Sequence, residues 1–547
     1  MSRSAYFDKE AQNALVEGIN LVANAVKTTL GYAGKTVVIQ REDKSPLITK
    51  DGISVAKEIS PRDEKVKLGA DLAISVAQKQ LDSVGDGTTT ATVIAQAIVN
   101  AGVRQLELSE NTINRTSLRH GIEKARDYVI EKLDNMSKDI EKDEDLNNIA
   151  MVSANGDEKL GGIVAEAYRK VGKDGVVIVE ETKDRDIRLE FKEGMTFDKG
   201  WTSQFFITNH ENQTVEFDKP LILLCNSKIS NFKSLADIIQ GVLGRGQPLV
   251  IIAESFDTSV TQGLAMNIVR SGGQLKVACV EAPSYGDARL DRLRDMALYL
   301  GANVGDDPMG IKFEAMSEAD FGSCDKIIIK RDETVISGGH GNEADIKARV
   351  EAIQGEINNL KENATWEKDV LNKRLAALTT GVAVIKVGGS SEEEIKELKD
   401  RLEDAQYAVK AALEEGYLPG GGVTLLRLAS EVDELGSNNE DELVGMTIFA
   451  SALKAPFKTI VENAGLHADV VIPQVLVQAS EYGYNVATMK VANMLEDGII
   501  DPTKAVKGAV FAASSIASVA LTSSVIICED PKKEAGVNLN MQGMPMM

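Results

Sequence analysis

The hydrophobic pattern of this chain changes character twice along its 547 residues. Roughly the first 135 residues follow a helical spacing with few strand-like runs. From about residue 170, short runs rich in β-branched residues, such as 221–225 and 248–253, alternate with helical stretches. After about residue 392 the pattern is mostly helical again. We therefore expect two helical ends that pack together and an inserted α/β domain, in a chain too long for a single core.

The composition is that of a soluble globular protein, with 43% hydrophobic residues, 26% charged residues and a net charge of −22. An acidic excess of this size opposes binding to nucleic acids and anionic membranes, so we expect neither as a partner. The four cysteines include no C-x-x-C pair and the four histidines are isolated, which argues against a disulfide framework and a transition-metal site. The N-terminus has no apolar signal segment, so we expect a cytoplasmic protein.

Two segments near the C-terminus need a separate interpretation. Residues 508–528 carry no charge over 21 positions, which is long enough to cross a bilayer. Their serines, threonines and alanines make a weak membrane segment, and we expect a buried core helix instead. Residues 537–547 are polar and rich in methionine, and we expect a disordered tail.

The run Gly85-Asp86-Gly87-Thr88-Thr89-Thr90 precedes an apolar helical pattern at 91–99. Its glycines let the backbone approach a ligand, and its threonines lie at the positive end of the following helix. A phosphate is favoured at such a helix start. Because Asp86 would repel a bare phosphate, its presence fits a Mg²⁺ ion between the two. The simpler alternative is a capped helix start without a ligand.

Three further turns have a similar composition. The loop 28–35 resembles a P-loop, but Thr29 stands where that motif needs glycine, and a helix precedes the loop while a strand follows it. Any nucleotide site in this loop is therefore not of the Walker type. The second is the carboxylate turn 49–52, and the third is the glycine run 420–422. For the glycine run, a plain helix break is the alternative.

Taken together, these segments resemble the group I chaperonins, the GroEL-like family. The resemblance is collinear over nearly all of the chain. The matching segments are Thr29-Leu30-Gly31, Ile48-Thr49-Lys50-Asp51-Gly52, Gly85-Asp86-Gly87-Thr88-Thr89-Thr90-Ala91-Thr92, Gly420-Gly421-Gly422, Gly483-Tyr484-Asn485 and Asp501-Pro502-Thr503.

The resemblance implies the chaperonin fold, a multidomain combination of α and α/β domains. Both chain ends would form a helical equatorial ATPase domain, joined by a small α/β intermediate domain to an inserted α/β apical domain that binds polypeptides. The implied ranges are 1–134 and 416–547 for the equatorial domain, 135–193 and 382–415 for the intermediate domain, and 194–381 for the apical domain.

The resemblance also implies an ATPase that uses ATP, Mg²⁺ and K⁺. Asp86 matches the family's Mg²⁺ ligand, and Asp51 and Asp404 match the carboxylates that position and activate the attacking water. Since Asp404 belongs to the intermediate segment, hydrolysis would require this segment to close onto the nucleotide. Without the resemblance, Asp404 would be interpreted as an exposed helix carboxylate.

Further residues are implied in nucleotide and ion binding. The backbone carbonyls of Thr29 and Lys50 match the positions that bind K⁺. Tyr32-Ala33 stands where the family commonly has Pro-Lys, which removes a cation and is expected to weaken nucleotide affinity. The implied nucleotide-binding residues are Thr29, Leu30, Gly31, Lys50, Gly87, Thr88, Thr89, Thr90, Gly421, Gly422, Asn485, Ala487, Ile499 and Asp501.

For the apical domain, the resemblance implies a surface that binds non-native polypeptides. Aromatic rings suit this task because they bury a large area with little ordering cost. Ala236, Thr261 and Ala265 stand where the family more often has larger aliphatic residues, which weakens the match. For Phe205 and Phe206, ordinary core packing is the alternative. The implied binding residues are Trp201, Ser203, Phe205, Phe206, Ile239, Leu264 and Met266.

The implied partners are other copies of the chain in a ring of seven, non-native polypeptides and a co-chaperonin lid. At the usual contact between two rings this chain has Lys458, His467 and Asp469, with His467 in place of an acidic partner, and a short insertion lies at 106–111. A single ring and a stacked double ring are therefore both open.

Three other functions remain as alternatives. A chaperonin-like ring without a lid would act as a holdase or scaffold for particular clients. A metabolic or signalling ATPase would need a further catalytic cluster, which the sequence does not show. A scaffold that does not hydrolyse ATP is disfavoured by the presence of all three acidic residues.

Overall fold

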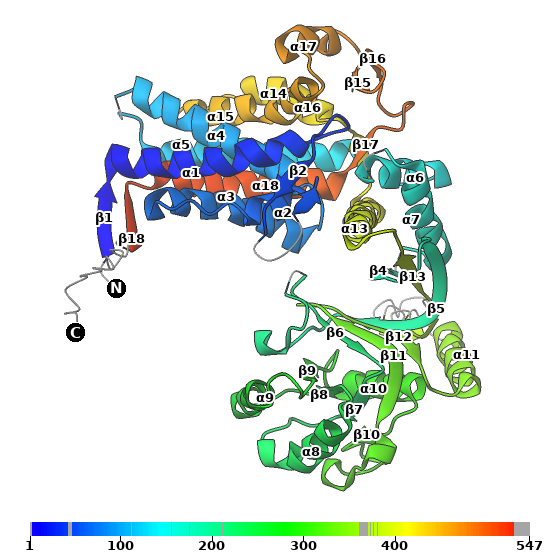
Figure 1. Ribbon diagram of the computed structural model, residues 1–547. Helices are drawn as coiled ribbons and strands as arrows, with labels where there is room; N and C mark the ends of the chain where they lie inside the picture. The colour runs from blue at the N-terminus through cyan, green and yellow to red at the C-terminus, as the bar shows by residue number, and fades with distance from the viewer. Residues whose placement is uncertain are drawn as a thin grey trace, which may run out of the picture. The chain divides into compact units, whose positions relative to one another are not determined.

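The computed structural model describes residues 3–529 except 42–45, 111, 155, 174, 183, 211, 360–369, 372, 373, 376 and 380 (Figure 1). The chain separates into two compact units, one made of residues 1–165 with 388–547 and the other of residues 166–387. The predicted tail at 537–547 lies outside the described residues.

The unit built from both chain ends is mostly helical. Its first part comprises β1 (Arg3–Phe7), α1 (Asp8–Val26), β2 (Val37–Ile39), β3 (Leu47–Thr49), α2 (Gly52–Lys57), α3 (Glu64–Ser83), α4 (Thr88–Leu108), α5 (Arg115–Met136), α6 (Asp143–Ser153) and the start of α7 (Glu158–Val171). Its second part comprises α13 (Glu392–Glu415), β14 (Tyr417–Pro419), α14 (Val423–Asp433), α15 (Glu440–Leu453), α16 (Ala455–Asn463), α17 (Ala468–Leu476), β15 (Tyr482–Asn485), β16 (Lys490–Asn493), β17 (Ile500–Pro502), α18 (Thr503–Thr522) and β18 (Val525–Glu529).

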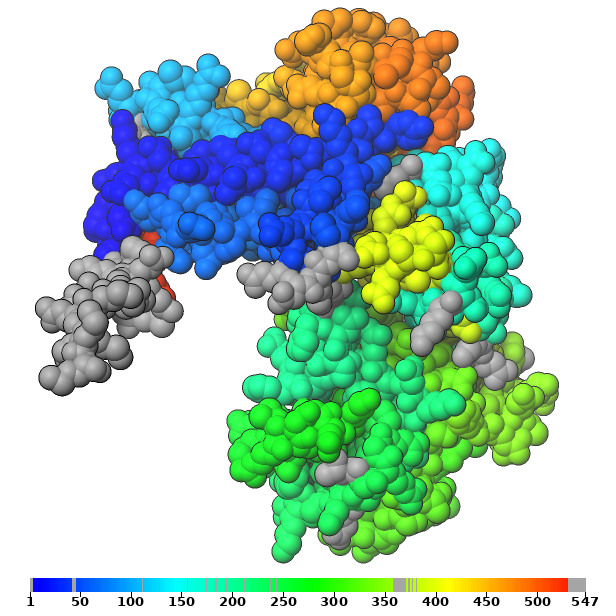
Figure 2. All heavy atoms as spheres, in the orientation of Figure 1, coloured from blue at the N-terminus to red at the C-terminus, as the bar shows by residue number. Residues whose placement is uncertain are grey.

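The core of the helical unit joins elements from the two ends of the chain. The apolar spacing of α1 buries Leu15, Ile19, Val22 and Val26 on one face. Helix α18 packs against α3, α4 and α5, and β18 pairs antiparallel with β1. Figure 2 shows the yellow atoms of α13 against blue atoms of the N-terminal part of the chain. Neither end can therefore complete this core alone.

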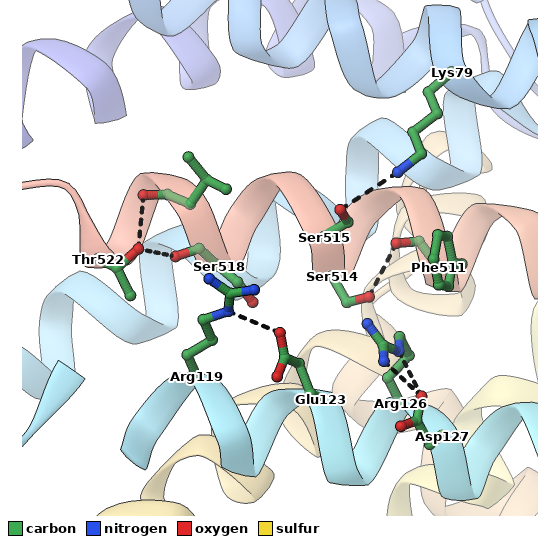
Figure 3. Close-up of polar contacts among 11 residues, drawn as sticks. Lys79, Arg119, Glu123, Arg126, Asp127, Phe511, Ser514, Ser515, Ser518 and Thr522 are labelled. Carbon is green, nitrogen blue, oxygen red and sulfur yellow. Dashed lines mark hydrogen bonds and ion pairs between the residues drawn. The ribbon is translucent and has the colours of Figure 1, made fainter. Parts of the chain in front are cut away.

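The uncharged segment 508–528 forms most of α18 and β18, as expected for a core element. Two helical stretches, Glu440–Asn463 and Thr503–Thr522, are long and apolar enough to cross a membrane by length and composition, and more than half of each apolar window is buried. On the outer side of α18, the ring of Phe511 lies between the ammonium of Lys79, at 4.9 Å, and the guanidinium of Arg126, at 5.1 Å (Figure 3). These contacts with α3 and α5 are typical of a packed helix with one cation-covered face.

The second unit is an α/β domain around one mixed sheet. Its elements after α7 are β4 (Val176–Glu181), β5 (Arg188–Phe197), β6 (Val215–Asp218), β7 (Leu221–Cys225), α8 (Ala236–Arg245), β8 (Leu249–Ala253), α9 (Thr258–Arg270), β9 (Val277–Glu281), α10 (Gly286–Leu300), β10 (Val304–Gly305), β11 (Gly322–Ile329), β12 (Thr334–Gly339), α11 (Glu343–Asn359) and β13 (Gly381–Val387). The strand order is β4-β13-β5-β12-β11-β7-β8-β9, with β10 beside β7 and β6 beside β11.

The strands predicted at 221–225 and 248–253 are confirmed as β7 and β8, which run parallel and are buried. The predicted domain boundaries at 193/194 and 381/382 fall inside β5 and at the start of β13. These two strands pair with each other, with Gly381 opposite Glu193. The division into three named domains therefore stays a prediction.

A buried ionic cluster ties α10 to two later parts of the chain. The carboxylate of Asp295 accepts hydrogen bonds from Arg349 Nε at 2.9 Å and from Arg374 Nε at 2.8 Å and Nη2 at 3.0 Å. Arg374 Nη1 also donates to Asp291 at 3.0 Å. Asp295 is 2% exposed and Arg374 is 4% exposed, so both charges depend on these partners.

Candidate nucleotide-binding site

Three acidic side chains from separate elements of the helical unit approach one another. Asp51 precedes α2, Asp86 lies in the turn between α3 and α4, and Asp404 lies on α13. Burial raises the pKa of Asp404 well above its usual range and the charges of Asp51 and Asp86 raise it further, so both of these carboxylates lie within electrostatic reach of Asp404. The structure thus brings together the three residues predicted to be catalytic.

The turn that carries Asp86 has a backbone that requires glycine on both sides. Gly85 has φ +86° and Gly87 has φ +81°, a region that other residues rarely adopt. A Cβ on Gly85 would lie 2.3 Å from the ring of Tyr407, so α13 packs directly on this turn. Asp86 Oδ1 accepts a hydrogen bond from the Gly87 N–H at 2.6 Å, and α4 then begins at Thr88.

Asp51 is the N-cap of α2. Its two carboxylate oxygens accept hydrogen bonds from the backbone N–H groups of Ile53 at 3.2 Å and Ser54 at 2.9 Å. The neighbouring Gly52 lies against α4, because a Cβ there would be 2.1 Å from Thr89 Oγ1. The turn that contains Lys50 and Asp51 is therefore fixed against the start of α4.

The loop after α1 is closed by its own backbone. Lys35 N–H donates to Thr28 C=O at 2.8 Å, and Gly34 N–H donates to Gly31 C=O at 2.9 Å. Asn463 Nδ2 donates to the carbonyls of Lys27 and Leu30, each at 2.9 Å. This role of Asn463 was not predicted from the sequence, where it appears only as a polar residue at the end of an amphipathic helix.

The glycine run holds the last acidic residue of the site. The backbone N–H groups of Gly421 and Gly422 donate to the carboxylate of Asp501, which lies on β17. Gly421 and Gly422 both have positive φ, and Gly422 is the N-cap of α14. The side chain of Ile499 lies 3.8 Å from the position of a Cβ on Gly421. These four predicted nucleotide-binding residues are therefore neighbours.

Asn485 and Ala487 lie in the β15–β16 hairpin, where Asn485 serves the hairpin loop. Its side-chain oxygen accepts from the N–H groups of Ala487 at 3.0 Å and Thr488 at 3.2 Å, and its Nδ2 donates to Asp497 at 2.6 Å. With these three bonds made, the side chain has a structural role in this loop. The predicted contact of Asn485 and Ala487 with the nucleotide stays a prediction.

Three further acidic residues, Asp86, Asp501 and Asp400, have raised pKa values. Burial raises the pKa of Asp86 to about 6, and burial together with the charge of Asp86 raises the pKa of Asp501 to about 6. On α13, burial and the charges of Asp51 and Glu403 raise the pKa of Asp400 to about 7. Asp400 was not predicted as part of this site, although its spacing of four from Asp404 places both residues on one helix face.

A cluster of this kind fits a bound cation. Among the described residues, no three His, Cys, Asp or Glu side chains are arranged to hold a metal ion by themselves. Mg²⁺ usually takes only one or two carboxylates and completes its shell with water and substrate phosphates. The helix start at Thr88 is a favoured position for such a phosphate. The donor set therefore fits Mg²⁺ bound together with a nucleotide.

The raised pKa of Asp86 predicts how the stability of the nucleotide-free protein depends on pH. A carboxyl whose pKa is higher in the folded state than in the unfolded state stabilises the fold at low pH, and this contribution is lost as the pH rises from about 4 through about 6. The Asp86→Asn variant is therefore expected to be more stable than wild type by about 2 kcal/mol at pH 8. The advantage should shrink toward pH 5, which thermal unfolding at several pH values would measure. A constant difference between the two proteins would contradict the prediction.

Helix α13 packs on the turn that carries Asp86. Asp404 lies within electrostatic reach of Asp51 and Asp86, and Tyr407 lies against Gly85. An ion pair of 3.5 Å between Arg401 and Asp157 holds the same helix near the start of α7. The closure of this segment onto a nucleotide stays a prediction.

The residues predicted to bind polypeptides fall into two groups. Phe205 is 69% exposed and Met266 is 53% exposed. Trp201 and Ser203 are half-buried, with Trp201 Nε1 donating to Gln213 C=O at 3.0 Å and Ser203 Oγ capping the turn that carries Phe205. These four residues lie in the α/β unit and keep access to solvent.

The other three residues belong to the hydrophobic core. Phe206, Ile239 and Leu264 are nearly or fully buried in the main cluster of the α/β unit. Their assignment to a binding surface is therefore wrong for this conformation, and core packing, the alternative weighed for Phe206, applies. Val269 on α9 and Tyr285 before α10 are strongly exposed. Their exposure was not predicted from the sequence, because a single apolar residue in a helix pattern does not reveal which face it occupies.

The residues discussed for ring–ring contacts lie around α17. Lys458 Nζ is 3.3 Å from Asp469 Oδ1 of the same chain, and His467 is the N-cap of α17. Leu108, in the insertion, is 69% exposed. The charge of Lys458 is therefore already paired within the chain.

A comparison with protein families gives one match over most of the chain. The model of the TCP-1/cpn60 chaperonin family matches residues 22–531. Among solved structures, the chain is similar to the chaperonin gp146 from the bacteriophage EL 2 (Pseudomonas aeruginosa), crystallised in the presence of ATP-BeFx. The TM-score is 0.67 at 21% sequence identity, over 96% of this chain and 99% of that chain. At this identity the likeness shows a shared fold.

Proposed function

Because the chain belongs to the TCP-1/cpn60 chaperonin family, we propose that it is an ATP-driven chaperonin of the group I, GroEL-like kind. It would bind non-native polypeptides, enclose them in a ring chamber and promote their folding through ATP binding and hydrolysis. The observation that carries the ATPase part of this proposal is the convergence of Asp51, Asp86 and Asp404 beside the start of α4.

In this proposal each part of the site has one task. Asp86 would hold Mg²⁺, and the bound ion would supply charge neutralisation for phosphoryl transfer. Asp51 and Asp404 orient the attacking water and accept its proton. The backbone and hydroxyls of residues 88–90 hold phosphate at the helix start, and the carbonyls of Thr29 and Lys50 are the proposed K⁺ ligands.

Self-association is supported by two small sheets with apolar exposed strands. In the β2–β3 pair, Val38 is 67% exposed and Ile48 is 51% exposed, and they lie opposite each other. In the β1–β18 pair, Val525 and Ile527 are exposed. Short two-stranded sheets with unpaired apolar edges are readily extended by another chain. We therefore propose that copies of the chain meet through these sheets in a seven-membered ring.

The proposed client surface consists of Phe205, Met266 and Val269. All three are apolar, strongly exposed and carried by the α/β unit. Exposed apolar side chains of this kind bind varied unfolded segments by burial alone. A co-chaperonin lid is a further proposed partner of this surface, and the cytoplasm is the proposed location.

Two measurements on the purified protein test the proposal. Native mass without nucleotide and with Mg-ATP and K⁺ should be about seven or fourteen times the 58.9 kDa chain mass. The protein should also suppress aggregation of a chemically unfolded model protein and release it on ATP addition.

Replacing Phe205, Met266 and Val269 by serine should abolish most of this suppression without changing the ATPase rate, because the three side chains lie outside the acidic site.

The outcomes separate the alternatives. Suppression without ATP-dependent release would favour a holdase ring without a folding cycle. A monomer that hydrolyses ATP would favour an ATPase without a folding role. A ring that binds but does not hydrolyse ATP would favour a scaffold.

A further inference from the structure

Gln80, near the end of α3, is a fully buried polar residue that the sequence motifs do not include. It is 0% exposed, and its Nε2 donates to the backbone carbonyl of Asp86 at 2.6 Å and to that of Ala505 at 3.0 Å. The first carbonyl belongs to the turn before α4, and the second belongs to the first turn of α18. One side-chain amide therefore joins two segments that are more than 400 positions apart.

The surroundings of Gln80 are shaped to this side chain. A Cβ on Gly87 would lie 3.1 Å from Gln80 Nε2, and a Cβ on Gly508 would lie 2.6 Å from Gln80 Oε1. Since both Nε2 partners are carbonyl oxygens, the amide orientation is fixed by donor and acceptor chemistry. Gln80 Oε1 is buried without a hydrogen-bond partner among the described residues, which costs stability. A residue with no task beyond filling this space would be an apolar one.

The two joined segments lead to two residues of the candidate site. Asp86 lies in the turn that Gln80 holds, and Asp501 lies four residues before Ala505. The two hydrogen bonds of Gln80 fix the backbone at Asp86 to the first turn of α18.

We propose that Gln80 is a positioning residue for Asp86. Its side-chain amide joins the Asp86 turn to the start of α18 and so holds the Asp86 carboxylate in place for Mg²⁺. The inference rests on the proposed ATP site and adds a residue that never touches the ion or the nucleotide. Its signature is a change in Mg²⁺ dependence, because without the two hydrogen bonds of Gln80 the turn that carries Asp86 must be ordered when the ion binds.

The test uses the full chain with Gln80→Met, which keeps the length of the side chain and removes both donors. The Mg²⁺ concentration that gives half-saturation of ADP binding, measured by titration calorimetry at fixed ADP, should rise about tenfold, as expected for two lost hydrogen bonds. The KM for ATP at saturating Mg²⁺ should change little. In the nucleotide-free protein, the backbone amides of residues 85–88 should exchange hydrogen faster.

Gln78→Met is the matched control on the same helix. Gln78 is half-buried and donates to Asp82 at 2.6 Å, away from the Asp86 turn, so its replacement should leave Mg²⁺ dependence and exchange unchanged. If Gln80→Met does not assemble, Gln80→Ala with the same exchange measurement serves instead.

The results distinguish the proposed function from the positioning role of Gln80. A wild-type protein that does not bind ADP with Mg²⁺ would overturn the proposed function itself. A wild type that binds, with Gln80→Met showing the same Mg²⁺ half-saturation and the same exchange at 85–88, would overturn the inference alone. A lower melting temperature with unchanged Mg²⁺ dependence would show that Gln80 only stabilises the fold, and would overturn it too.

Discussion

Replacing Asp404 by asparagine is expected to lower the ATP turnover number by about two to three orders of magnitude, while nucleotide binding stays nearly unchanged. Asp404 approaches Asp51 and Asp86 from α13, whereas the proposed phosphate-binding elements are the loop after α1 and the start of α4. The amide keeps the size of the side chain but cannot accept a proton from water. Phosphate release at saturating Mg-ATP, with binding measured by calorimetry, would give both quantities.

The same substitution is expected to stabilise the nucleotide-free protein. Burial and four nearby carboxylates raise the pKa of Asp404 well above its usual range, so the charged form destabilises the fold at neutral pH. Asp71→Asn, at an exposed position on α3, is the matched control and should change neither turnover nor stability. A turnover within about threefold of wild type would remove Asp404 from the catalytic set.

The second large effect is expected in the α/β unit, where Asp295→Ala should lower the free energy of unfolding by about 3 to 5 kcal/mol. The substitution leaves Arg374 buried without the carboxylate that binds two of its nitrogens. Calorimetric unfolding of the whole chain should show an earlier transition, and hydrogen exchange should increase in β7, β8 and β9, which share the core with α10.

Asp307→Ala provides the comparison for this effect. Asp307 also binds an arginine through two oxygens, at 2.8 Å each to Arg294, but Arg294 keeps 39% of its side chain exposed. The expected loss is about 1 kcal/mol, because water can solvate the freed guanidinium. Equal losses for the two variants would show that burial does not set the cost of the Asp295 cluster.

The sequence predicted the elements whose pattern is set by local burial. Residues such as Ile19 and Val22 repeat at helical spacing because α1 has one buried face, and β7 and β8 are continuous apolar runs because both faces of a parallel strand are covered. Strand β5 was not predicted, although its alternation of charged and apolar residues is typical of a partly exposed antiparallel strand.

Only those residues of the candidate site that lie in turns could be predicted from local sequence. Asp51 and Asp86 stand in glycine-containing turns whose backbone demands are visible in the sequence. Asp404, Asp400 and Gln80 lie within helices, where an acidic or amide residue has the same local appearance on an exposed face as in a site. The resemblance to a family identified Asp404, but tertiary packing alone shows Asp400 and Gln80.

Burial of single side chains was the least predictable property. Phe205 and Phe206 are neighbours in sequence, yet the first is exposed and the second lies in the core. The short helical turn that carries them places successive side chains on different faces, and the sequence does not fix the rotation of such a turn. Leu264 and Met266 on α9 differ for the same reason.

The pairing of β1 with β18, the first and last described strands, affects folding during synthesis. Residues 166–387 form a contiguous unit that can fold as soon as it leaves the ribosome, while the rest of the chain is still being synthesised. Helices α1, α3, α4 and α5 emerge earlier but must wait for α18, which at usual synthesis rates takes some tens of seconds. During that time their apolar faces are open to aggregation. Under the proposed function, a newly made copy of this protein would itself be a client of rings that are already assembled.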